Sequence, residues 1–153
     1  MIAQMLQKEN IQILDQVADW QEAVRVSVEP LVRTGFVEPR YADGIIANAL
    51  ELGPYFVLTD DVALLHGRPE QGVIEKQLAV TVVHKSVDFS GDGKRQARLL
   101  VTLAATNGED HIDVMATLAE LFMNEEKILQ VIDSKSAEEV YRIFLAAEEA
   151  ALQ

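Results

Sequence analysis

The chain has 153 residues, 49% of them hydrophobic, and its 25 acidic and 13 basic side chains give a net charge of −12. The length predicts one folded domain over residues 1–153, since globular domains commonly span about 100–200 residues. The charge argues against nucleic acid and anionic membranes as partners, and the absence of cysteine excludes disulfides, thiolate metal sites and cysteine nucleophiles.

The first third of the chain predicts a short strand followed by two helices. Apolar residues within 11–17 fit a strand and its exit. A helix is predicted to begin near Asp19, because Glu22 follows this capping aspartate by three residues, and to end at Gly35. A second helix is predicted over residues 39–52, because proline is favoured in the first turn and a Gly-Pro pair follows the segment.

The middle of the chain predicts strands. Residues 55–58 and 62–65 are apolar runs of strand length, and residues 78–83 and 99–103 are rich in β-branched side chains. A turn-forming cluster at residues 90–94 separates the last two runs. The near-continuous apolarity of these strands indicates a sheet that is buried on both faces.

The last third of the chain returns to helical spacing. One apolar stripe covers residues 112–122, a second short helix is predicted over 125–132, and a capping box at Ser136–Glu139 opens a final helix. Helices, then strands, then helices predict an α/β fold, a three-layer α/β/α sandwich with a central mixed β-sheet flanked by helices. No apolar stretch reaches the ~18–20 residues of a membrane span, and no signal peptide is evident, so we expect a cytoplasmic protein.

His66 is the first candidate for chemistry. It follows an apolar strand and precedes Gly67, Arg68 and Pro69. Glycine leaves room beside the imidazole for a large donor, and the guanidinium of Arg68 suits a phosphoryl or carboxylate group. A histidine in this position is a candidate nucleophile for phosphoryl transfer, and an ordinary loop histidine is the alternative.

Two further histidines are present. His111 lies near a predicted helix start, where free N–H groups favour anions, although a surface histidine in a first helical turn is the simpler interpretation of the residues alone. His84, at a strand end, is interpreted as structural or solvent-facing. The spacing of the three histidines matches no zinc motif, so no metal site is predicted.

Longer segments resemble the enzyme IIA component of the phosphoenolpyruvate-dependent sugar phosphotransferase system (PTS), of the mannitol/fructose type. The segments that carry the resemblance are Gly53–Val57, Val62–Arg68, Asp110–Met115 and Ser136–Val140. The strings Val37–Tyr41 and His66–Val73 resemble the L-ascorbate branch in particular.

This resemblance implies a phosphotransferase component that works through a phosphohistidine. In the family, the histidine matching His66 accepts a phosphoryl group from phospho-HPr and yields it to a cysteine of the IIB component, while the membrane IIC permease imports the sugar. The histidine matching His111 helps to position the group, and we expect Arg68 and Gly67 to contribute to phosphate binding. The resemblance implies no cofactor.

Two departures from the family pattern bear on the site. Leu65 stands where many relatives have proline, and Ala49 aligns with a helix arginine of the mannitol-type proteins, whose place Arg68 is hypothesised to take. The leading interpretation is a carrier in the uptake of L-ascorbate or a related sugar. The alternatives are a regulatory PTS-like protein that signals by its phosphorylation state, and an interaction domain without phosphoryl transfer.

Overall fold

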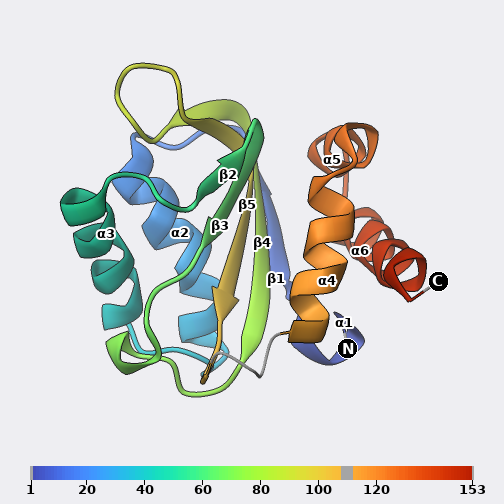
Figure 1. The fold of residues 1–153 in the computed structure, drawn as a ribbon, viewed down its shortest axis with the longest axis horizontal. Helices are drawn as coiled ribbons and strands as arrows, with labels where there is room; N and C mark the ends of the chain where they lie inside the picture. Colours follow the sequence, from blue (N-terminus) through green and yellow to red (C-terminus); the bar gives the residue numbers. More distant parts are fainter. Residues whose placement is uncertain (1, 108–111, 153) are drawn as a thin grey trace.

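The computed structural model describes residues 2–107 and 112–152. Within this part of the chain a five-stranded sheet lies between two layers of helices (Figure 1). The helices α2 and α3 cover one face, and α4, α5 and α6 cover the other (Figure 1). In chain order the elements are α1 (Ile2–Met5), β1 (Leu6–Leu14), α2 (Trp20–Arg33), α3 (Arg40–Leu52), β2 (Val57–Thr59), β3 (Asp61–Leu65), the 3₁₀ turn η1 (Pro69–Gln71), β4 (Gln77–Asp88), β5 (Gln96–Ala104), α4 (Ile112–Phe122), α5 (Glu125–Ile132) and α6 (Ala137–Ala151).

The sheet is mixed, with the strand order β1-β4-β5-β3-β2. The pairs β1–β4 and β3–β5 are parallel, whereas β4–β5 and β2–β3 are antiparallel. This arrangement confirms the predicted α/β/α sandwich. The prediction of a strand over residues 55–58 was partly wrong, because the Val57 N–H donates to the Pro54 oxygen in a turn and β2 begins only at Val57.

Burial of the sheet on both faces is clearest in β3. Val62 and Leu64 belong to the hydrophobic core shared with α4, α5 and α6, while Ala63 and Leu65 belong to the core shared with α2 and α3. All four side chains are buried. Because successive side chains of a strand point to opposite faces, a strand between two helical layers needs apolar residues at every position, as the sequence indicated.

The predicted helix caps are present. The Asp19 carboxylate accepts the N–H of Glu22 at 2.8 Å, and the Ser136 hydroxyl accepts the N–H of Glu139 at 3.2 Å. In both helices the glutamate reaches the N–H of the residue before the cap, rather than that of the cap itself. Pro39 immediately precedes α3, so this boundary differs by one residue from the prediction.

The hydrogen bond that α2 loses at its internal proline is replaced by a bond from the sheet. Pro30 has no N–H with which to bond the oxygen of Val26, four residues earlier. The side-chain amide of Gln12, in β1, donates to that oxygen at 2.7 Å and to the Thr81 hydroxyl at 3.0 Å. This bond joins α2 to the sheet without an unsatisfied carbonyl.

The start of β3 is anchored by an ion pair. Asp61 adopts a left-handed backbone conformation with φ of 68°. Its carboxylate accepts two hydrogen bonds from the guanidinium of Arg98, each 2.8 Å long. A bidentate pair of this kind fixes geometry as well as charge, so the strand that leads to His66 begins from a defined position.

Among the described helices, none is both long and apolar enough to cross a membrane.

Candidate functional site

His66 is the first residue after β3, and its imidazole is half-buried. Its Nδ1 atom lies 2.7 Å from the backbone oxygen of Leu64. A carbonyl oxygen only accepts hydrogen bonds, so this contact places the ring proton on Nδ1. The Nε2 atom then carries the free lone pair, which makes it the nucleophilic nitrogen of the ring.

Tyr55 packs against the same imidazole. The two rings meet edge-on, with centroids 5.2 Å apart and an interplanar angle of 86°. The Tyr55 hydroxyl donates a hydrogen bond to the backbone oxygen of His66. Burial raises the pKa of Tyr55, an effect that Asn48 and the charge of Arg68 partly offset. The hydroxyl therefore remains a donor at neutral pH.

Tyr41 connects the loop after His66 to the core. This residue of α3 is fully buried, and its hydroxyl donates to the Leu103 oxygen and accepts the N–H of Gly67, both at 2.9 Å. Burial raises the pKa of Tyr41 to about 12, although the Gly67 N–H acts in the opposite direction. One phenol thus joins α3, β5 and the histidine loop.

The side chain of Gln71 binds the next peptide group, between Gly67 and Arg68. Its Oε1 atom accepts the N–H of Arg68 at 2.8 Å and an amide hydrogen of Asn48 at 2.9 Å. In return, Nε2 of Gln71 donates to Oδ1 of Asn48 at 3.0 Å. Three consecutive residues, from His66 to Arg68, therefore each have a backbone polar group bound by a side chain from outside β3.

Gly67 is closely surrounded on its inner side. A Cβ atom at this position would lie 2.8 Å from Oε1 of Gln71 and 3.2 Å from the ring of Tyr41. Contacts this short force a neighbour to move. The structure thus gives Gly67 a packing role beneath the loop, in addition to the open access that the sequence suggested.

Arg68 lies on the surface beside the histidine. Its side chain is 62% exposed, and its Nε atom contacts the carboxylate of Glu70 at 3.0 Å. The loop thus carries an exposed cation two residues after His66, paired with the carboxylate of Glu70. A guanidinium offers several N–H donors, which suits it to the oxygens of a phosphoryl group.

Of the other two histidines, the structure describes only one. His111 lies outside the described residues. His84, in β4, is exposed as expected, and its Nδ1 is 3.5 Å from a carboxylate oxygen of Asp15. Across residues 2–107 and 112–152, no group of three histidine, cysteine, aspartate or glutamate side chains is arranged to hold a metal ion.

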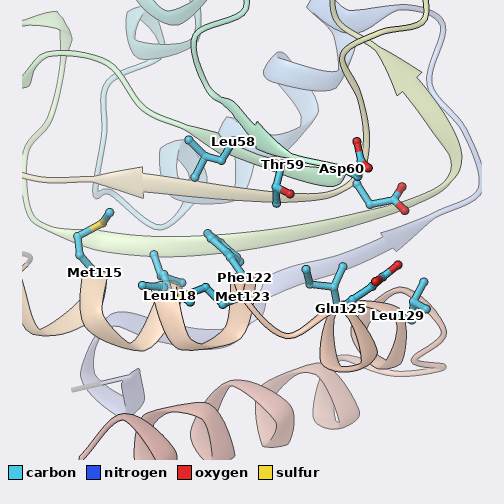
Figure 2. Close-up of a pocket in the computed structure, with 12 residues that line it drawn as sticks. Leu58, Thr59, Asp60, Met115, Leu118, Phe122, Met123, Glu125 and Leu129 are labelled. Carbon is cyan, nitrogen blue, oxygen red and sulfur yellow. The ribbon is translucent and has the colours of Figure 1, made fainter.

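A cavity of about 630 Å³ lies elsewhere, between α4, α5 and the β2–β3 turn (Figure 2). Its wall is largely apolar, and Asp60 and Glu125 add carboxylates (Figure 2). Asp61 lines this cavity at the start of β3, whereas His66 follows the end of that strand, about 16 Å further along the chain, and His66 is not among the residues that line the cavity. An apolar and acidic lining does not suit a phosphoryl group.

Four residues around His66 were missed from the sequence: Tyr41, Asn48, Tyr55 and Gln71. The helical spacing of Tyr41 and Asn48, seven residues apart, places both on one face of α3 and was a usable signal. Arg68, Pro69 and Gln71 also follow a helix-start pattern, with proline first and glutamine at the third position. Tyr55 has no comparable local signal.

Comparison with known proteins identifies the class. Residues 4–147 match the family model described as "Phosphoenolpyruvate-dependent sugar phosphotransferase system, EIIA 2". The chain therefore belongs to this family of phosphotransferase components, as the resemblance predicted.

Individual relatives are consistent with this. The "Ascorbate-specific PTS system EIIA component" of Escherichia coli (strain K12) is 31% identical over 137 residues, which cover 89% of each chain. The solution structure of the mannitol-specific cryptic enzyme IIA CmtB from E. coli superimposes with a TM-score of 0.85 at 27% identity, covering 94% of this chain and 97% of that one. The IIA–IIB mannitol complex from E. coli, which contains phosphorylated IIB, matches with a TM-score of 0.80 at 27% identity, over 93% and 99% of the two chains.

Proposed function

We propose that this chain takes a phosphoryl group from phospho-HPr onto Nε2 of His66 and passes it to a cysteine of a IIB component, for uptake of L-ascorbate or a related sugar. The observation that carries the proposal is the contact between Nδ1 of His66 and the Leu64 oxygen, which leaves Nε2 free. The family supports the carrier role, and the name of the 31% identical relative supports ascorbate.

The transfer itself needs little proton movement. The Nε2 lone pair attacks phosphorus, the Nε2–P bond forms, and the bond between phosphorus and the donor nitrogen breaks. Nδ1 keeps its proton throughout, donated to Leu64, so this carbonyl disperses the positive charge that develops on the ring. Transfer onward to a thiolate of IIB reverses these steps at the same nitrogen.

The phosphoryl oxygens need donors, and Arg68 is the proposed source of positive charge. Its exposed guanidinium turns to the group by exchanging its contact with Glu70 for the phosphoryl oxygens. His111 is proposed as a second imidazole beside the group, on the family resemblance alone. Gly67 leaves the approach to the ring open for the partner's reactive side chain.

HPr and IIB are proposed to dock on one surface around His66, because each must bring its own reactive atom to the same nitrogen. A IIA–IIB pairing has a counterpart in the mannitol complex of E. coli. The IIC permease is proposed to act only through IIB, in a cytoplasmic reaction sequence. Competition between HPr and IIB in a titration is expected, and simultaneous binding would contradict the shared surface.

The decisive experiment is intact mass after incubation with phosphoenolpyruvate, enzyme I and HPr, at mildly alkaline pH that spares phosphohistidine. A gain of one phosphoryl group is expected for the wild type and for His84→Ala, and none for His66→Ala. An unmodified wild type in the presence of active partners would overturn the proposal.

A further inference from the structure

We infer that Gln71, oriented by Asn48, is a positioning residue that holds the His66 loop in the geometry required for phosphoryl transfer; this rests on the function proposed above. Gln71 ends η1, and it binds both backbone groups of Arg68. Its own N–H donates to the Arg68 oxygen at 2.9 Å, while its side-chain Oε1 accepts the Arg68 N–H at 2.8 Å. One residue thus binds the peptide groups on both sides of the residue two positions after the nucleophile.

The orientation of the Gln71 amide is determined by its partners. Its Nε2 atom donates to Oδ1 of Asn48 at 3.0 Å and to the Gly44 oxygen at 3.4 Å, while Nδ2 of Asn48 donates to Oε1. Rotating the Gln71 amide by 180° would set its NH₂ group against the N–H of Arg68. Asn48 is 92% buried, so this reciprocal pair is largely shielded from competing water.

The space around Gln71 is available only because two neighbours are glycine. A Cβ atom at Gly44 would lie 3.0 Å from the Gln71 side chain, and one at Gly67 would lie 2.8 Å from Oε1. Gly44 belongs to α3 and Gly67 to the histidine loop, so both walls of this space are backbone. A side chain at either glycine would therefore displace the Gln71 amide from its hydrogen bonds.

The effect on chemistry is indirect. Gln71 does not touch the reacting atoms, but it fixes the backbone of Arg68 and, through the intervening glycine, that of His66. Transfer requires Nε2, phosphorus and the donor atom to lie nearly in line, and a misplacement of 1 Å can cost about 100-fold in rate. Loss of the two hydrogen bonds between Gln71 and the Arg68 backbone should therefore reduce the rate of transfer more than the binding of the donor.

The test compares Gln71→Met with Gln12→Met. Methionine retains the approximate volume and removes the amide, and Gln12 is a matched control because its side chain also bonds a backbone oxygen, but between β1 and α2. Single-turnover transfer from phospho-HPr is measured by rapid quench, with thermal unfolding of each variant. Gln71→Met should transfer about tenfold more slowly or worse, with the half-saturating phospho-HPr concentration changed by no more than about twofold. Gln12→Met should lose stability but retain the wild-type rate.

Spectroscopy separates positioning from general loss of structure. In Gln71→Met the amide proton of Arg68 should shift upfield and the ring nitrogens of His66 should move towards mixed tautomers, whereas Gln12→Met leaves both unchanged. Asn48→Ala should also slow transfer, and because Asn48 bonds Tyr55 as well as Gln71, the double variant with Gln71→Met should be slowed by less than the product of the two single effects.

The outcomes distinguish the two proposals. A wild-type protein that accepts no phosphoryl group would contradict the proposed function. A phosphorylated wild type together with an unchanged rate in Gln71→Met, or an equal slowing in Gln12→Met, would overturn the positioning role and leave the carrier function intact. If Gln71→Met does not fold, the Asn48→Ala rate decides in its place, and an unchanged rate there overturns the inference.

Discussion

The hydroxyl of Tyr55 donates a hydrogen bond to the backbone oxygen of His66, and its ring packs at nearly a right angle to the imidazole of the same residue. Tyr55 thus contacts both the main chain and the side chain of His66. Since Tyr55 lies before β2 and His66 after β3, this contact also closes the β2–β3 hairpin on the site.

Replacing Tyr55 by phenylalanine should keep the ring contact and remove the hydrogen bond. We expect a loss of about 1 kcal/mol in the free energy of unfolding and a transfer rate lowered several-fold. Tyr141→Phe is the control, because that ring lies in α6 over the ammonium of Lys8, 5.3 Å from its centroid. Chemical denaturation and single-turnover transfer measure the two effects, and equal rates in both variants would argue against a role for the hydroxyl.

The phosphoryl group should be attached to Nε2 and not to Nδ1. The proton on Nδ1 is donated to the Leu64 oxygen at 2.7 Å, so the lone pair of that nitrogen is unavailable. Two-dimensional ¹⁵N–¹H spectra of the imidazole, recorded before and after phosphorylation, assign the site. A phosphorus coupling to Nδ1 would mean that the imidazole leaves its bond to Leu64 and rotates about the Cβ–Cγ bond before it reacts.

An alanine in place of Gly67 should destabilise the loop from within. The added methyl group would lie 2.8 Å from Oε1 of Gln71 and 3.2 Å from Tyr41, and overpacking of this kind costs about 1–3 kcal/mol. Adding Gln71→Ala should recover part of this loss, because the nearest obstacle is removed. Denaturation of the two single variants and the double variant measures the coupling, and strictly additive losses would show that the two positions do not interact.

The sequence was sufficient for the layers of the fold, since burial on both faces of β3 requires an unbroken apolar run and the caps at Asp19 and Ser136 mark two helix starts. It also pointed to His66 and Arg68, because their chemistry is local to one loop. The pairing of Asn48 with Gln71 was not predictable, because the two side chains meet only after α3 packs beside η1. An amide on a helix carries no sign of its partner 23 residues away.

Arg68 should contribute to transfer through its charge. In Arg68→Ala the phosphoryl oxygens lose a charged donor, and we expect a transfer rate lowered about tenfold or more, since hydrogen bonds to charged groups contribute roughly 1.5–3 kcal/mol. Glu70→Gln is the informative counterpart, because it weakens the competing contact of 3.0 Å and should leave the rate unchanged or raise it. Quenched-flow transfer at low and moderate salt makes the comparison. A preserved rate in Arg68→Ala would exclude Arg68 as the substitute for the helix arginine of mannitol-type relatives.

Ionisation of Tyr41 should lower the free energy of unfolding at alkaline pH. Burial raises its pKa to about 12 in the folded chain, against 10.0 when unfolded, so its neutral form is favoured by folding. This contribution is complete below pH 10 and is lost as the pH rises towards 12, by up to about 3 kcal/mol at ~1.4 kcal/mol per pH unit.

Tyr41→Phe removes this titration together with the bonds to Gly67 and Leu103. At pH 8 the variant should be less stable than the wild type by about 1–3 kcal/mol, because a part-buried N–H and a buried carbonyl lose their partner. Between pH 10 and 12 the difference in free energy of unfolding between the two proteins should become smaller, since only the wild type must keep a buried phenol protonated. Urea denaturation at intervals of half a pH unit measures this difference. If the free energies of unfolding of the two proteins change in parallel up to pH 12, Tyr41 ionises as readily in the folded chain as in the unfolded one.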